Sequence, residues 1–149
     1  KGVKRDEDLA FKLYMKSAKQ GEAVAQRNVA SLYSSGKVIE QDHQKAMKWY
    51  KKSALQGNAI SQYGLGSYYF NGSEINQDYK EAVKWFRLAA EQGDAPAQYN
   101  LGRMYLLGKG DDKNILEGRF WIKQALENND EYIGILAQQV WDDFKLGSY

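Results

Sequence analysis

KWYKKSALQG (residues 48–57) and KWFRLAAEQG (residues 84–93) are near copies of each other that start 36 residues apart, at positions 48 and 84. Shifting the whole sequence by this distance, without a gap, aligns most of the chain. Self-similarity at a fixed period is typical of repeat proteins, so the chain is expected to be an array of similar units. The clearest aligned columns hold tryptophan (Trp49, Trp85, Trp121), tyrosine (Tyr33, Tyr69, Tyr105) and glycine (Gly21, Gly57, Gly93).

Each unit is predicted to contain two helices. Within residues 59–71, small and apolar residues such as Leu65, Gly66 and Tyr69 recur at steps of three or four, which places them on one face of a helix. A glycine inside a helix costs about 1 kcal/mol relative to alanine. Gly66 and its counterpart Gly102 are therefore expected where a neighbouring helix packs so closely that it leaves no room for a Cβ atom.

Polar and glycine residues at fixed places in each unit are expected to begin and end these helices. Asp and Asn are favoured N-cap residues, and glycine after a helix favours a left-handed ending. The fourth unit has Asn129 where the others have glycine, so Asn129 is expected to adopt the left-handed conformation. The expected N-caps of the second helices are Asp6, Asp42, Asp78 and Asn114. The expected helices span residues 6–20, 23–35, 42–56, 59–71, 78–92, 95–107, 114–128 and 131–144.

No segment alternates like a strand, and a helix pair of this size cannot bury its apolar face alone. Stacked pairs are therefore predicted to form one all-α solenoid domain of helix-turn-helix units with a 36-residue period. The first residues align with a loop inside a unit, so we expect that further repeats, and any export signal, lie upstream. The predicted units are residues 1–21 (the second helix of a truncated repeat), 22–57, 58–93 and 94–129 (three repeats) and 130–149 (a C-terminal capping helix).

The segments DAPAQYNLGRMYLLGKG (residues 94–110) and EGRFWIKQALENN (residues 117–129) resemble the Sel1-like repeat, a relative of the tetratricopeptide repeat. The resemblance covers about residues 1–144, although Ser73 and Glu74 interrupt the Gly-x-Gly loop of the middle unit. It implies a right-handed α/α solenoid with a concave face. It also implies a scaffold that binds proteins, often in bacterial envelope, secretion, virulence or toxin-immunity settings. One branch of the family, described as β-lactamase-like, is rich in cysteine, and this chain has no cysteine.

Composition excludes several classes of protein and site. The chain of 149 residues is 43% hydrophobic and 27% charged, which is typical of a globular domain. The absence of cysteine excludes disulfides and thiolate sites. No apolar run approaches the length of about 20 residues that spans a bilayer, so membrane insertion is not expected. The compartment stays open, with a bacterial periplasmic or secreted location favoured over the cytoplasm.

Few residues are candidates for chemistry. His43 is the only histidine, so a His-based catalytic or metal site lacks a second histidine, and a structural or exposed role is expected for His43. The pairs Asp111–Asp112 and Asp142–Asp143 are interpreted as solvated acids. The glycines around Lys109 lack the spacing of a phosphate-binding loop. No catalytic residue, metal or cofactor is predicted.

A stripe beside the apolar face of each first helix is the predicted binding site. In helical-hairpin solenoids the first helix of each pair lines the concave side, so this stripe should form a groove. Tyr and Arg are favoured residue types at protein interfaces. For the tyrosines, packing between repeats is an equal alternative to binding. The predicted groove residues are Arg27, Tyr63, Ser67, Phe70, Tyr99, Arg103 and Leu106.

A scaffold that binds a protein or peptide is the favoured function, and three alternatives stay open. A nucleic-acid binder would need a basic groove, whereas residues 58–149 carry 9 Lys or Arg and 13 Asp or Glu. An enzyme or a cell-wall polymer binder is conceivable because aromatic stripes can stack on sugar rings. Residues 1–57 carry 12 Lys or Arg and 6 Asp or Glu, so opposite charges at the two ends would allow self-association.

Overall fold

The computed structural model describes residues 2–72 and 76–148, and within them the fold is entirely helical. Ser73 and Glu74, which interrupt the middle Gly-x-Gly loop, lie outside the described residues. The elements are α1 (Gly2–Lys19), α2 (Ala23–Ser35), α3 (His43–Ala54), α4 (Ala59–Asn71), α5 (Tyr79–Glu91), α6 (Ala95–Leu107), α7 (Ile115–Glu127), α8 (Glu131–Asp143) and a short 3-10 helix, η1 (Leu146–Ser148).

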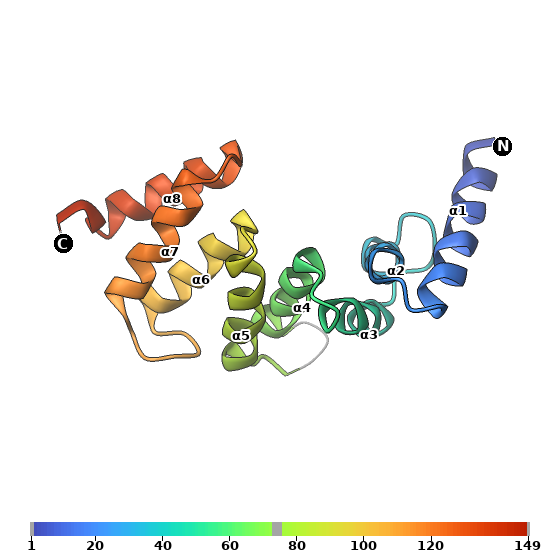
Figure 1. The fold of residues 1–149 in the computed structure, drawn as a ribbon, viewed down its shortest axis with the longest axis horizontal. Helices are drawn as coiled ribbons and strands as arrows, with labels where there is room; N and C mark the ends of the chain where they lie inside the picture. The colour runs from blue at the N-terminus through green and yellow to red at the C-terminus, as the bar shows by residue number, and fades with distance from the viewer. Residues whose placement is uncertain (1, 73–75, 149) are drawn as a thin grey trace.

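Each helix packs against the next helix in the chain, from α1 through α8. The array is therefore elongated, with the two termini at opposite ends (Figure 1). The helices at its ends, α1 and α8, both extend toward the upper edge of that view. Such nearest-neighbour packing defines a solenoid and confirms the predicted all-α repeat fold. At the C-terminal end, η1 follows α8, and its Leu146 is buried in a cluster with residues of α6, α7 and α8.

The second helices of the complete repeats begin at the predicted caps. Asp42, Asp78 and Asn114 each accept a hydrogen bond from the backbone N–H three residues later. Asp6 is an exception, because α1 begins at Gly2 and Asp6 lies inside the helix. In the complete repeats the backbone N–H of the cap residue also donates to a tyrosine carbonyl of the preceding first helix, as Asp42 does to Tyr33. The described chain has no first helix before α1 to make this bond, so the helix continues through Asp6.

The prediction for Asn129 is wrong. The helix α7 ends at Glu127, and Asn128 leaves it in an extended conformation, with φ −73° and ψ 153°. Among the described residues other than glycine, only Lys145 has a positive φ. The chain therefore turns from α7 into α8 without the left-handed residue that Gly57 and Gly93 supply in the earlier repeats.

Close helix packing explains the two glycines inside helices. A Cβ atom on Gly66 would lie 2.8 Å from the Phe86 ring, and one on Gly102 would lie 2.8 Å from the Ile122 side chain. Both distances are shorter than carbon atoms tolerate, so only glycine lets α4 approach α5, and α6 approach α7, this closely. The expectation from the sequence is confirmed at both positions.

Buried glutamines link successive repeats, which the sequence analysis did not predict. Gln26, Gln62 and Gln98 each donate a side-chain hydrogen bond to the carbonyl of an alanine eight residues earlier. A residue just after the next second helix then donates to each glutamine, as Gln92 Nε2 does to Gln62 Oε1 at 2.7 Å. Buried amides need such partners, so these bonds hold each turn against the next repeat.

Candidate functional site

The predicted groove residues lie on α2, α4 and α6, the first helices of the three complete repeats. These helices carry only two charged side chains, Arg27 and Arg103. The helix α3, by contrast, carries four lysines. The first helices therefore present an aromatic and mostly neutral surface, while the second helices carry most of the charge.

Two of the predicted residues line a hollow between the repeats 22–57 and 58–93. Tyr63 and Ser67 contribute to its wall, and its volume is about 390 Å³. Tyr63 is half-buried, with its ring 5.7 Å from that of Phe86, and Ser67 donates to the Tyr63 carbonyl at 3.0 Å. The hollow is lined by residues of α2, α3 and α4, namely Ser34, His43, Tyr50, Ile60, Tyr63, Gly64, Ser67, Tyr68 and Asn71.

A chain of hydrogen bonds forms one wall of this hollow. The Tyr68 hydroxyl donates to Ser34 Oγ at 3.1 Å and lies 3.0 Å from His43 Nδ1. The rings of His43 and Tyr68 meet edge to face at 5.9 Å. His43, for which a structural or exposed role was expected from the sequence, is therefore a half-buried member of a polar cluster that joins three helices.

This polar cluster is specific to one junction of the array. The equivalent positions at the next junction hold Phe70, Tyr79 and Met104, where the Phe70 and Tyr79 rings pack 5.5 Å apart. At the last junction they hold Leu106, Ile115 and Val140. The sequence contained this signal, because Ser34 and His43 of one repeat and Tyr68 of the next are polar where the later repeats are mostly apolar, but only the structure shows that those columns meet.

Tyr50 adds a desolvated hydroxyl group to the same hollow. Burial raises the pKa of the Tyr50 phenol, the nearby Tyr68 raises it further, and Ser31 and Arg27 act in the opposite direction. The ring of Tyr50 also packs against the backbone of α4, because a Cβ atom on Gly64 would lie 3.2 Å from it. Arg27 and Tyr63, which lie 36 positions apart in two successive repeats, are thus both close to the half-buried Tyr50 phenol.

Tyr99 and Arg103 line a second hollow, between α6 and α8, of about 230 Å³. The Arg103 guanidinium lies 5.4 Å from the centre of the Tyr99 ring, a cation–π distance that holds both side chains at the surface. Asp143 also lines this hollow, so its charge is mixed. The predicted stripe is therefore divided into two hollows.

The last two predicted residues are less accessible. Phe70 is half-buried between the rings of Tyr79 and Phe86, at 5.5 Å and 6.3 Å. Leu106 is only 1% exposed and packs in the core with Ile122. A partner that touches the surface of the folded array cannot reach the Leu106 side chain, so Leu106 is a core residue and is not part of the candidate site.

The described residues offer little that resembles a catalytic or metal centre. Within residues 2–72 and 76–148, no group of three or more His, Asp or Glu side chains is placed to hold a metal ion. Over the same residues, no helix is long and apolar enough to cross a bilayer. The arrangement is suited to contact with another molecule through shape, aromatic rings and hydrogen bonds.

Comparison with known proteins identifies the repeat. The Sel1 repeat family model matches residues 1–22, 23–58, 59–94 and 95–130, bounds that lie one residue later than those expected from the period. No curated protein matches the chain significantly.

Solved structures of Sel1-type proteins share the fold. The protein c5321 of uropathogenic Escherichia coli, described as a protective antigen displaying an SLR fold, is 36% identical, with a TM-score of 0.77, over 80% of this chain and 26% of its own. A Sel1 repeat protein from Oxalobacter formigenes is 28% identical, with a TM-score of 0.81, over 91% of this chain and 55% of its own. Cysteine-rich protein B of Helicobacter pylori is 22% identical, with a TM-score of 0.69, over 90% of this chain and 96% of its own, which is a likeness of fold alone.

Proposed function

The chain belongs to the Sel1 repeat family, and on this premise we propose that it is a non-catalytic scaffold that binds an extended segment of a partner protein along α2, α4 and α6. The observation that carries the proposal is the hollow between the repeats 22–57 and 58–93. It combines aromatic rings with hydrogen-bonding groups from three helices, and its polar cluster is absent from the equivalent positions of the later repeats.

The chemistry of this surface favours a peptide as the ligand. Tyrosine rings bury large areas at low entropic cost, and hydroxyl, amide and imidazole groups can bond to peptide backbone. Arg27 and Arg103 supply the only charges on the three helices and suit a segment with carboxylate groups. Because α4 carries no charge at all, a nucleic-acid backbone would find no continuous basic track there.

We propose a bacterial setting, in the envelope, in secretion, in virulence or in toxin immunity. The support is the family itself and the described role of c5321 as a protective antigen. The chain spans only about a quarter of c5321 and about half of the Oxalobacter protein, so the complete activity of those proteins enters here as a proposal and not as a finding.

A peptide selection tests the binding site. Phage-displayed random peptides are selected on the immobilised protein, and a selected peptide is then titrated by fluorescence anisotropy. Ser67→Arg would place a long side chain in the hollow and should abolish binding. Asn129→Arg adds the same side chain on an exposed turn and should leave the affinity unchanged.

The outcomes separate the parts of the proposal. Loss of binding in the Ser67→Arg variant alone, with a melting temperature close to that of the parent, supports the groove. Equal affinities of both variants would place the site elsewhere. Selection of no peptide at all would refute a peptide-binding scaffold. Sedimentation velocity over a concentration series tests self-association, which would appear as a larger species at low salt.

A further inference from the structure

In the second helices of the two later repeats, a glutamate accepts a hydrogen bond from the tryptophan four residues after it. In α5, Trp85 Nε1 donates to Glu81 Oε2 at 3.2 Å, and Lys84 Nζ lies 3.2 Å from the other oxygen of the same carboxylate. In α7, Trp121 Nε1 donates to Glu117 Oε2 at 3.2 Å. An acid four residues before each tryptophan therefore satisfies the indole N–H and neutralises nearby cations.

The helix α3 lacks this glutamate–tryptophan hydrogen bond. Lys45 occupies the position of Glu81 and Glu117, so the acceptor for the indole N–H of Trp49 is replaced by a cation. No other acceptor for Trp49 Nε1 is found among the described residues. The Lys52 ammonium group instead lies 4.5 Å from the centre of the Trp49 ring. The indole of Trp49 is half-buried, whereas Trp85 and Trp121 are each only 6% exposed.

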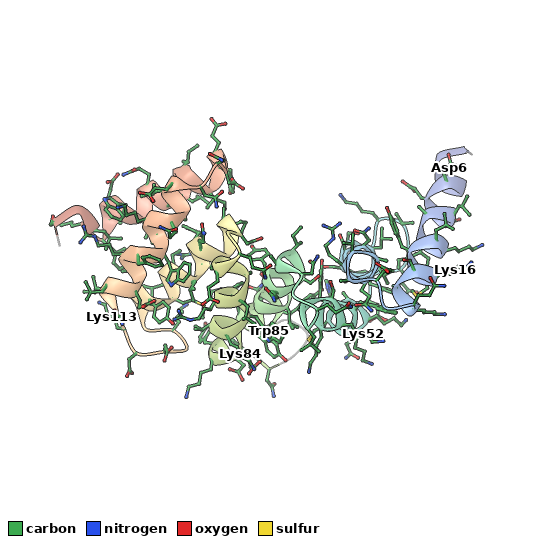
Figure 2. All side chains as sticks on the ribbon, viewed as in Figure 1. Asp6, Lys16, Lys52, Lys84, Trp85 and Lys113 are labelled. Carbon is green, nitrogen blue, oxygen red and sulfur yellow. The ribbon has the colours of Figure 1, made fainter. Side chains whose placement is uncertain are left out.

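Lysines surround this tryptophan, and within the described part of the chain only one of them is paired with an acid. The helix α3 contains no Asp or Glu, and its four lysines are all exposed. Among the described ion pairs, only Lys45 of these four meets a carboxylate, that of its helix cap Asp42 at 3.0 Å. Figure 2 shows Lys52 on α3 and Lys84 on α5 along one edge of the molecule, where the second helices are exposed to solvent.

A hollow with an apolar floor lies between these lysines. Its volume is about 430 Å³, and Leu55, which is 69% exposed, forms part of it beside Trp49. In the following repeat the position of Leu55 holds Glu91. Two acids of the repeat pattern are thus replaced here, one by Lys45 in α3 and one by Leu55 directly after it. The residues that line the hollow are Lys45, Lys48, Trp49, Lys51, Lys52 and Leu55.

We propose that this basic and aromatic patch on α3 is a second binding site, separate from the groove, that takes an acidic segment of a partner protein. Carboxylates of the segment pair with Lys48, Lys51 and Lys52, and one of them accepts from Trp49 Nε1, as Glu81 does from Trp85. An apolar side chain of the segment fills the hollow against Trp49 and Leu55. The helix is about 18 Å long, which an extended segment of about five or six residues would match.

The extent of the patch favours an acidic protein segment over a nucleic acid. A phosphate backbone is bound along a continuous basic track. On α5, the next second helix, the positions of Lys45 and Leu55 hold Glu81 and Glu91, so the track ends after one helix in that direction. The apolar floor also needs an apolar side chain as its occupant, which a protein segment supplies between its acids.

The test uses a fluorescein-labelled peptide of alternating Glu and Phe residues, titrated by anisotropy against the whole chain. A peptide with Gln in place of Glu is the probe control. The Lys48→Glu/Lys52→Glu variant should bind the peptide about tenfold more weakly, because each exposed Lys–Glu ion pair with the peptide is replaced by two glutamates that repel each other. Lys80→Glu/Lys113→Glu makes the same change in net charge at exposed sites outside the patch and should bind as the parent does.

A third variant restores to α3 the glutamate–tryptophan pair of the later repeats. Lys45→Glu recreates on α3 the Asp-x-x-Glu start of α5 and returns an acceptor to Trp49. It should fold with an unchanged or higher melting temperature and still bind the acidic peptide several-fold more weakly. Ser67→Arg, which blocks the groove, should leave this binding intact, so failure of the patch and failure of the groove are distinguishable.

Four results would overturn the proposal. The first is equal affinity of the Lys48→Glu/Lys52→Glu and Lys80→Glu/Lys113→Glu variants for the acidic peptide, and the second is equal affinity of the parent for the Glu and Gln peptides. The third is an undiminished affinity of the Lys45→Glu variant. The fourth is an affinity that does not fall as the salt concentration rises. A labelled single-stranded oligonucleotide and phosphatidylserine vesicles serve as parallel probes. Tighter binding of either one, lost in the Lys48→Glu/Lys52→Glu variant, would assign the patch to that class of ligand instead.

Discussion

Replacing single glycines by alanine separates packing from helix propensity in this fold. Gly102 and Gly134 both lie inside first helices, α6 and α8, so alanine should add about 1 kcal/mol of helix propensity at either position. The space around them differs. A Cβ atom on Gly134 meets nothing within 4 Å, whereas one on Gly102 lies 2.8 Å from Ile122 Cδ1 and 3.0 Å from its backbone nitrogen.

The contact at Gly102 is expected to outweigh the gain in propensity. Overpacking a buried contact costs about 1–3 kcal/mol, and the Ile122 backbone cannot move without moving α7. Gly134→Ala should therefore be stabilised by up to about 1 kcal/mol, and Gly102→Ala should be neutral or destabilised by up to about 2 kcal/mol. The propensity gain is common to both variants, so their difference, about 1–3 kcal/mol, measures the packing contribution alone.

Urea unfolding followed by far-UV circular dichroism measures both free energies, and thermal melts give a second reading. Domains of this size shift by about 2–4 °C per kcal/mol, so the two melting temperatures should differ by several degrees. Gly66→Ala should also destabilise, but less than Gly102→Ala, because the atoms it meets belong to the Phe86 ring and not to backbone. If Gly102→Ala were as stable as Gly134→Ala, the close approach of α6 and α7 would be refuted.

Two further predictions concern the core and a helix cap. Trp85→Ala should lose about 3–5 kcal/mol in urea unfolding because Trp85 is buried against Ala54 and Leu65, and Trp85→Phe should lose less; an unchanged midpoint would contradict the core assignment. Burial raises the pKa of Asp94, as does the charge of Asp130, against the opposing bond from Ala97 N–H. The raised pKa means that stability from this group is present at low pH and is lost as pH rises through the folded pKa. Asp94→Asn keeps a good N-cap, so it should melt above the parent at pH 7, and the gap should shrink on acidification below the folded pKa; a gap that widens on acidification would contradict this sign.

The repeat period, the helices and most of their ends follow from the sequence because each depends on residues close together in the chain. Steps of three and four place Leu65 and Tyr69 on one face regardless of what packs against them. The caps at Asp42 and Asp78 bond to backbone only three residues away. The two errors, Asp6 and Asn129, occur where this local rule depended on a neighbouring helix or on the course of the chain after the helix.

The candidate site could be predicted only in part. Tyr63 and Ser67 of the predicted stripe line the same hollow because they are one turn apart on α4, and their role in binding stays a prediction. The stripe is divided into two hollows by the packing of α2, α3 and α4 at one and of α6 and α8 at the other. Leu106 is buried by the packing of α6, α7 and α8, which the spacing within a single helix does not reveal.

By itself the sequence determined that this protein is an all-α array of helix-pair repeats, since a 36-residue period with caps and glycines in register permits few other folds. The Sel1 type of these repeats followed from the resemblance of residues 94–110 and 117–129 to that family. Only the tertiary structure decided which differences between the repeats meet in space. Ser34, His43 and Tyr68 are separated by 9 and 25 positions, yet Ser34 and His43 both form hydrogen bonds with the Tyr68 hydroxyl. Lys45 matters because it occupies the position at which a neighbouring repeat has the acceptor for a tryptophan. The physical reason is that hydrogen bonds and contacts act over a few ångströms, so they depend on the packing of helices and not on distance along the chain.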